Sequence, residues 1–297
     1  MSARPAFVAL SRGAAQSDGA PARPAASIVG AAGRRAALTA LGTTLAACAL
    51  PGTAPDARAA ARASLAPSGT LRAAINFGNP ILANRDPATR RPVGVSVDLA
   101  RELGRELGVA VELVPFEAAG RVTDALASNA WDVAFLAVDP VRGREIAYSA
   151  PYVVIEGAYG VAQGSPIVAN GDVDRPGTRV VVARGSAYDL HLTRSLRFAA
   201  LVRVPTSQQV TDAMLAQGLE VAAGVRQQLE SDRRRHPSMR LLPGRFMVIE
   251  QAIGTPIARA DGARYLADFA ERMKASGFVA QALARHRIEG AAVAPPR

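Results

Sequence analysis

The sequence predicts an α/β protein with two lobes and two hinge strands between them. Three observations lead to this fold class. Strand-like and helix-like segments alternate along residues 70–138, and the same alternation restarts at residue 179. Two apolar, extended segments, 152–162 and 247–254, can lead from the first unit to the second and back. Apolar residues make up 49% and charged residues 20% of the 297 residues, which is ample for two cores.

The first unit begins with an apolar strand at 71–76, followed by a loop at 77–92 rich in Gly, Asn, Pro and Arg. A helix is expected over 94–107, because Val95, Leu99, Leu103 and Leu107 recur on one face and Gly108 stands at the C-terminal cap position. The remaining expected elements are a strand at 109–114, a helix at 118–126 and a strand at 131–138. This order implies a parallel sheet with right-handed crossovers.

The second unit has the same alternation without a sequence repeat. We expect strands at 179–183, 201–204 and 219–223, helices at 186–196, 206–216 and 225–235, extended segments at 241–242 and 246–253, and helices at 261–275 and 278–287. The expected domain boundaries are lobe 1 at 70–155 plus 252–290, lobe 2 at 156–251, and a disordered tail at 291–297.

The N-terminus has the pattern of an export signal. Arg34 and Arg35 precede an uncharged run, 36–47, that is too short to cross a membrane but suits a signal-peptide core. The run ends in Leu-Ala-Ala before Cys48, which resembles a bacterial lipobox. We therefore expect a lipoprotein-type signal peptide at 1–47, lipidation of Cys48, and a flexible tether at 48–69; the alternative is an ordinary signal cleaved near 61–63.

Charge and composition exclude several classes of protein. The net charge is +10, but the basic residues are nearly all Arg and spread along the chain, and only 5% of residues are aromatic, so we predict no nucleic-acid partner. Loss of residues 1–47, with five Arg and one Asp, would leave about +6. One cysteine excludes an internal disulfide, and His191, His236 and His286 lack metal-ligand spacing, so we predict no metal and no cofactor.

An ordered set of local motifs resembles one known family. The motifs are Gly94–Leu99, Ala127–Val133, Asp139–Arg142 with Tyr148–Tyr152, Val180–Ser186 and Met273–Phe278. Together, over roughly residues 70–287, they resemble bacterial extracellular solute-binding proteins of family 3, the periplasmic amino-acid-binding components of ABC transporters. The resemblance implies a two-lobed, type II periplasmic-binding-protein-like fold, a ligand between the lobes, an ABC permease as partner, and no catalytic residues.

The resemblance also implies which residues bind the ligand. Arg142 matches the arginine that pairs with the ligand carboxylate, and a planar guanidinium suits that role better than Lys. Gly185 and Ser186 open a helix whose free N–H groups could hold the same anion, although Ser186 alone would also serve as an ordinary N-cap. Ala137 would offer a backbone N–H group.

Two further positions concern the side chain of the ligand. Asn76 and Phe77, at the end of the first strand, would face the cleft, and an Asn where the family often has Asp disfavours a cationic ligand side chain. Asn76 also fits a plain turn position.

The clearest departure from the family is at Val225, where the family usually has the Asp that holds the ligand ammonium. Either Asp189 or Glu156 replaces that carboxylate, or the ligand lacks an α-amino group and is a carboxylate or keto acid. Arg226 would favour a dianion if it pointed inward, and would otherwise be a solvated residue of the first helical turn.

We therefore predict a monomeric, periplasmic binding protein of an ABC importer that captures a small carboxylate-bearing solute and contacts the membrane only through its lipid anchor. An alternative is an accessory or sensory protein of an exported oxidoreductase system. A third is an enzyme similar to cyclohexadienyl or arogenate dehydratases, which would need Glu156, Asp189 or Glu220 as a general acid of raised pKa.

Overall fold

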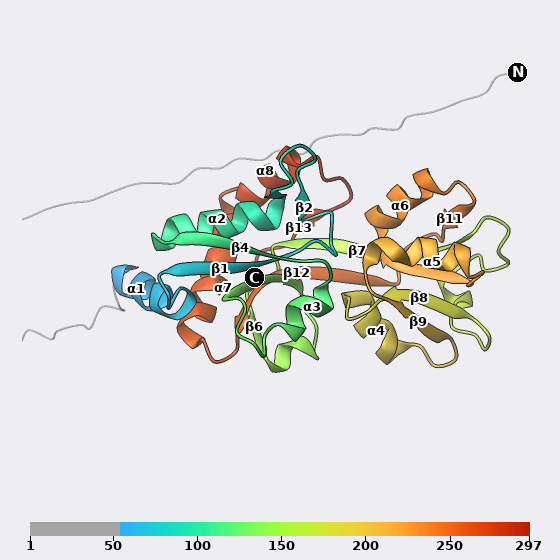
Figure 1. The fold of residues 1–297 in the computed structure, drawn as a ribbon, viewed down its shortest axis with the longest axis horizontal. Coiled ribbons are helices and arrows are strands. Elements are labelled where there is room, and N and C mark those ends of the chain that lie inside the picture. The colour runs from blue at the N-terminus through green and yellow to red at the C-terminus, as the bar shows by residue number, and fades with distance from the viewer. Residues whose placement is uncertain (1–53) are drawn as a thin grey trace, which may run out of the picture. The chain divides into compact units, whose positions relative to one another are not determined.

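The computed structural model describes residues 54–297 and shows two α/β lobes joined by long strands, as the sequence predicts (Figure 1). The expected signal peptide and Cys48 lie outside the described residues. The first lobe contains α1 (Ala54–Leu65), β1 (Thr70–Asn76), β2 (Asn84–Arg85), β3 (Pro92–Val93), α2 (Val95–Leu107), β4 (Ala110–Phe116), α3 (Ala119–Asp124), β5 (Val133–Ala137), η1 (Arg142–Arg144), β6 (Ile146–Tyr148), α7 (Ala260–Ala275) and α8 (Phe278–Arg285).

The other described elements form the second lobe and the strands that connect the two lobes. The second lobe contains η2 (Asn170–Asp172), β8 (Arg179–Ala183), α4 (Ala187–Ser195), β9 (Ala200–Val204), η3 (Ser207–Gln209), α5 (Val210–Ala216), β10 (Val221–Val225), α6 (Arg226–Arg235) and β11 (Met239–Leu241). The connecting strands are β7 (Val153–Ala162) and β12 (Met247–Pro256), and β13 (Ala292–Val293) pairs with β7.

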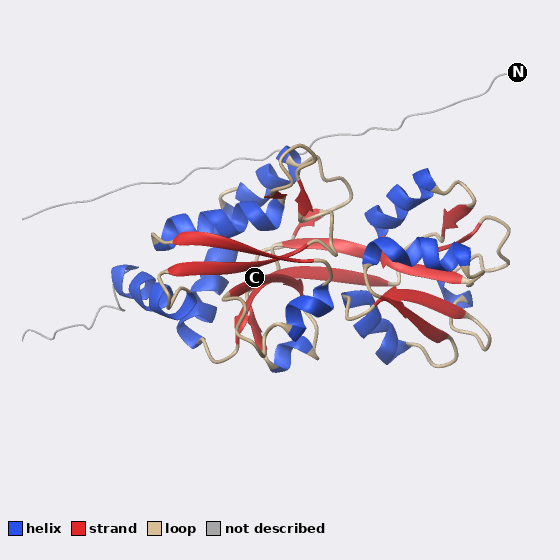
Figure 2. Ribbon diagram, in the orientation of Figure 1, coloured by secondary structure: helices blue, strands red, loops and turns tan. Residues whose placement is uncertain are grey.

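The main sheet runs in the order β4-β1-β5-β12-β7-β10-β8-β9, with β11 and β13 paired to β7 and β6 paired to β12; β2 and β3 form a separate two-stranded sheet. The three strands at each end run parallel, and β12 and β7 run antiparallel between them, from Met247 opposite Gly157 to Gln251 opposite Val153. Helices cover the strands in both lobes (Figure 2). The two middle strands therefore connect the lobes, where the sequence predicts hinge strands.

Each lobe has its own hydrophobic core. Helix α2 shows how the first is built: Val95, Leu99, Leu103 and Leu107 are buried on one face, and Gly108 ends the helix in the left-handed region at φ 67°. The core of the second lobe lies around β8 and β10. The predicted boundaries of the lobes, between residues 155 and 156 and between residues 251 and 252, stay a prediction. Ile249 and Val225, which these boundaries assign to lobe 2, pack with the core of the first lobe.

The prediction of a flexible tether at 48–69 is wrong for residues 54–65. Residues 54–65 form helix α1, which packs on α7 with Ala61 and Leu65 fully buried. The physical reason is that Ala and Arg are strong helix formers, and that Gly262 has no side chain to block Leu65.

The predicted disordered tail at 291–297 is also corrected. Ala292 and Val293 pair with β7, and the N–H of Ala294 donates to the carbonyl of Tyr152 at 3.1 Å. This segment is ordered because the edge of β7 has free backbone groups that it satisfies. In the part of the chain that the structure describes, we find no helix with the length and apolar character needed to span a membrane.

Candidate functional site

A cavity lies between the lobes, at the carboxyl ends of the parallel strands β1, β5, β8 and β10. Ligands of open α/β sheets bind at this position. It is lined by Asn76, Gly78, Asn79, Ala118, Ala119, Ala137, Arg142, Ala183, Arg184, Ser186, Ala187, Tyr188, Ser207, Val225, Ile249 and Gln251. Its volume is about 30 Å³, enough for roughly two waters, so the cleft is closed.

Arg142 is the buried cation of this cleft, and the structure places it where the sequence predicts a ligand-binding group. Its side chain is 5% exposed, and η1 holds it below the end of β5. One Nη donates to the carbonyl of Ala137 at 3.0 Å, and the other donates across the cleft to the carbonyl of Gly185 at 2.6 Å. Its Nε has no partner among the described residues.

The electrostatics of Arg142 favour an anion beside it. Burial lowers the pKa of its guanidinium, and the neighbouring Tyr148 and Asp139 act in the opposite direction. Asp139 is itself engaged, because it accepts from the N–H of Val141 at 2.8 Å and from Arg194 at 2.7 Å. Two protein hydrogen bonds use only two of the five guanidinium donors. Arg142 is therefore a desolvated cation with donors to spare.

Gly185 and Ser186 are close to Arg142, but the chain already uses the groups that the sequence suggests for a ligand. The N–H of Gly185 donates to Asp189 at 2.8 Å, and Ser186 Oγ accepts from the N–H of Asp189 at 3.0 Å as the N-cap of α4. Ser186 lines the cavity, whereas Gly185 contributes its carbonyl to Arg142 and lies outside the lining.

Of the three other predicted site residues, two line the cavity and one does not. Asn76 and Ala137 line the cavity. Asn76 Oδ1 also accepts from the N–H of Gly78 at 2.9 Å, which is the turn role that the sequence allows. Phe77 lies outside the lining: its carbonyl accepts from Gln208 at 3.0 Å, and its ring packs under the guanidinium of Arg85 at 4.1 Å.

Sequence reasoning missed four polar residues that line the cavity: Arg184, Tyr188, Ser207 and Gln251. Gln251 could have been found, because a polar side chain interrupts the apolar run of β12 and is only 5% exposed. Tyr188 donates to Ser207 at 2.9 Å, and no sequence signal marks either one, since their position in the cavity depends on how the lobes meet. Asn79 also lines the cavity, and its Oδ1 is buried without a partner among the described residues.

The three candidate carboxylates are all engaged with arginines and do not line the cavity. Glu156 pairs with Arg245 and Arg226, which lower its pKa, and Arg179 likewise lowers the pKa of Glu220. Arg226 begins α6, pairs with Glu156 at 2.8 Å and does not line the cavity, so it is not placed to bind a dianion there. Asp189, besides its contacts in the turn, pairs with Arg203 at 2.9 Å.

Several contacts hold the lobes together around the cavity. Arg194 of α4 pairs with Asp139 of the first lobe, and Arg142 reaches the carbonyl of Gly185. A Cβ added to Gly185 would lie 2.7 Å from the Cα of Gly120, so α3 and the β8–α4 turn meet backbone to backbone. Closure therefore depends on small residues and on charged pairs from both lobes.

Comparisons with known proteins identify the family and the fold. Residues 73–286 match the family described as bacterial extracellular solute-binding proteins, family 3. No curated protein sequence matches at a significant level. Similar solved structures include the solute receptor for L-cysteine of Neisseria gonorrhoeae, with TM-score 0.67, 19% identity, and coverage of 78% of this chain and 95% of that one.

Two other solved structures are similar. Holo ArgBP from T. maritima has TM-score 0.62 and 19% identity, with 72% of this chain and 95% of that one covered. The ancestral amino acid-binding protein AncCDT-1, a precursor of cyclohexadienyl dehydratase, has TM-score 0.63 and 18% identity, with 75% and 97% covered. At these identities the likeness establishes the fold, a two-lobed type II periplasmic-binding-protein-like architecture.

Proposed function

This chain belongs to the bacterial extracellular solute-binding proteins of family 3, and we propose that it captures a small carboxylate-bearing solute between its lobes for an ABC importer. The observation that supports this most directly is Arg142, a buried cation in the interlobe cleft with unused donors. A carboxylate there would form charge-assisted, two-pronged hydrogen bonds and restore the solvation that burial removes. Relatives of the same fold are named for amino acids, which is consistent with a carboxylate ligand.

The capture mechanism needs only binding. A carboxylate that contacts Arg142 of the first lobe and the β8–α4 turn of the second stabilises the closed form more than the open form. The ligand therefore shifts the population toward closure, and the closed surface is what a permease would recognise. No bond is made or broken in this scheme.

The experiment is a thermal-shift screen of the purified mature protein against amino acids, oxo acids and dicarboxylates, followed by calorimetric titration. At least one carboxylate should raise the Tm of the wild type, because a ligand at a hundred times its Kd adds about 2.7 kcal/mol of stability. Arg142→Ala should reduce its affinity about a hundredfold or more. Arg144→Ala is the matched control, since Arg144 is exposed on the same short helix. Equal loss in both variants, or undiminished binding by Arg142→Ala, would remove Arg142 from the site.

For its location, we propose export to the periplasm, processing at Cys48 and a lipid anchor, with the mature protein a monomer. The ordering of α1 supports processing at Cys48 over cleavage near 61–63, because the later cleavage would remove most of a helix whose residue Ala61 is buried in the fold. Mass spectrometry of the mature N-terminus would distinguish the two sites.

The dehydratase alternative finds no support in the site. A general acid at neutral pH needs a carboxyl group of raised pKa in the cleft. Glu156 and Glu220 instead have lowered pKa values and lie outside the cavity.

A further inference from the structure

We propose that the interlobe cleft selects a small carboxylate with an oxo or hydroxyl group and no ammonium group over the amino acid of the same carbon skeleton. This inference rests on the proposed function, because it concerns what the same cleft binds. The balance of charge in this closed, poorly solvated space is what would set the selectivity.

The charged residues that line the cavity are Arg142 and Arg184, and among the described residues no carboxylate lines it. Arg142 is buried, and Arg184 is exposed at the edge of the cavity. A monoanion beside Arg142 leaves the closed cleft neutral around that group. A zwitterion leaves the same space with an uncompensated positive charge, and burying an unpaired charge is strongly unfavourable.

The carboxylates in the walls do not alter this balance. Asp139, nearest to Arg142, is paired with Arg194. Asp189 is paired with Arg203, and its carboxylate accepts from the N–H of Gly185 and from the hydroxyl of Thr193. To reach a ligand ammonium, either one would have to leave an arginine and its backbone donors. Asp124 and Glu145 line a neighbouring hollow with Arg142, but both are exposed to water and neither lines this cavity.

The remaining polar groups of the cleft are neutral. Asn79 Oδ1 is a buried acceptor that no described residue contacts with a hydrogen bond, and Asn79 is 7% exposed. This one acceptor can accept a hydrogen bond from one ligand hydroxyl, and the side-chain amide of Gln251 can donate to an oxo group. An ammonium group has three donors and a full charge, so these neutral groups do not satisfy it. Val225 and Ile249 form an apolar wall that provides nothing to a cation. The cleft therefore matches one anionic end and one neutral polar group.

The first test compares matched acids by calorimetric titration at pH 7, where the α-amino group of every amino acid used is protonated. The pairs are pyruvate or lactate against alanine, 2-oxoglutarate against glutamate, and phenylpyruvate against phenylalanine. For each skeleton that binds, the oxo or hydroxy acid should bind at least about tenfold tighter than the amino acid. Tighter binding of any amino acid than of its partner would overturn this inference while leaving the capture function intact. Absence of binding by every acid to the folded protein would overturn the capture function, and this inference with it.

The second test adds the missing charge. Val225 ends β10 and lines the cavity, so Val225→Asp places a carboxylate in the apolar wall. The variant should shift the ratio of the two affinities toward the amino acid by about tenfold or more. Val225→Asn is the matched control, because it has the same shape without the charge, and it should leave the order of the two ligands unchanged. Circular dichroism and the melting curve establish that both variants fold. An unchanged ratio in the folded Val225→Asp variant, or an equal shift in Val225→Asn, would refute the charge argument.

Discussion

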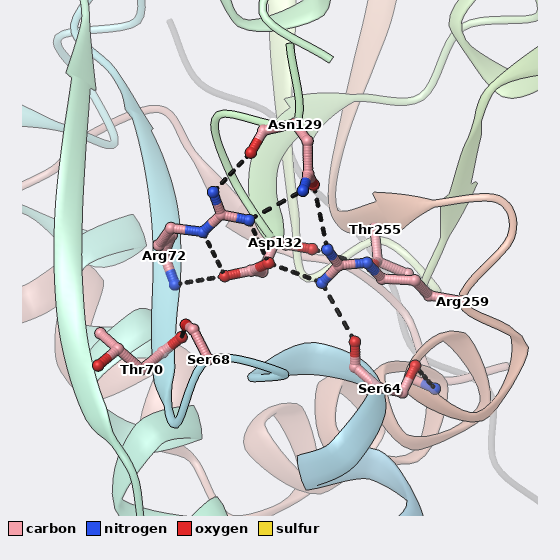
Figure 3. A network of polar contacts seen from close by, with 9 residues as sticks. Ser64, Ser68, Thr70, Arg72, Asn129, Asp132, Thr255 and Arg259 are labelled. Atoms are coloured by element: carbon pink, nitrogen blue, oxygen red, sulfur yellow. Dashed lines mark hydrogen bonds and ion pairs between the residues drawn. The ribbon is translucent and has the colours of Figure 1, made fainter. Parts of the chain in front are cut away.

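Replacing Asp132 by Asn should cost about 3 kcal/mol of unfolding free energy at neutral pH, and the cost should fall in acid. Asp132 is fully buried just before β5 (Figure 3). Its carboxylate accepts from Arg72 through the backbone N–H at 2.8 Å, Nε at 3.0 Å and Nη2 at 2.8 Å, and from Arg259 Nη1 at 2.7 Å. Its backbone carbonyl also accepts from Thr255.

The magnitude follows from these contacts. Removing one partner of a buried ion pair costs about 3–5 kcal/mol. We expect the lower end, because an Asn oxygen still accepts from the N–H of Arg72, and because the side chains of Arg72 and Arg259 keep 25% and 15% exposure to water. Asp261→Asn is the control: its pair with Arg264 is half exposed or more on both sides and should matter little.

The pH dependence has a definite sign. Burial alone would raise the pKa of Asp132, but the hydrogen bonds from Arg72 and Arg259 lower it below its ordinary 3.8. The stabilisation is therefore present above the ordinary pKa and is lost as the pH falls through the lower pKa of the folded state. Urea unfolding of wild type and variant at steps from pH 7 to pH 3 should show the gap narrowing in the acid range. A gap below about 1 kcal/mol at pH 7, or one that stays constant to pH 3, would refute this reasoning.

Two further predictions concern closure and the N-terminal helix. Gly185→Ala should weaken ligand binding by at least about tenfold in calorimetric titration. The new Cβ would meet the Cα of Gly120 in the closed form, and residue 185 has a φ of +67°, which disfavours a side chain. An affinity within twofold of wild type would contradict this prediction. Leu65→Ala should lower the free energy of unfolding in urea by about 2–5 kcal/mol, because it opens a hole in the core beneath α1; a loss under about 1 kcal/mol would mean that α1 is not part of the cooperative fold.

Much of the fold could be predicted from the sequence because the signals are local. The four-residue spacing of Val95 to Leu107 and the cap at Gly108 define α2 without reference to any other element. The apolar runs that become β7 and β12 are long and distinct, and they lie between two α/β alternations. Helix α1 was missed because its sequence is mostly Ala and Arg and, among its described side chains, only Ala61 and Leu65 are buried, so it shows little hydrophobic period. Its stability comes from packing on α7.

The site was predictable where it depends on a motif and not where it depends on closure. Arg142 follows β5 at a spacing that the sequence shows, and the structure buries it in the cleft. The engagement of Gly185 by Asp189 could not be foreseen, because it depends on the exact path of the β8–α4 turn. Asn79 and Ser207 come from different lobes and line one cavity only when the lobes meet.

The contact between Arg142 and the carbonyl of Gly185 connects the closed geometry to binding. A cavity of about 30 Å³ is too small for an amino or oxo acid, so the lobes must separate to admit one. In the proposed scheme a ligand carboxylate uses the donors of the Arg142 guanidinium that the described residues leave free. Contact of the same ligand with the β8–α4 turn exists only in the closed cleft, so this second contact shifts the liganded protein toward closure. Arg142 would thus provide affinity for the carboxylate, and the turn of the second lobe would provide the free-energy difference that the closing motion requires.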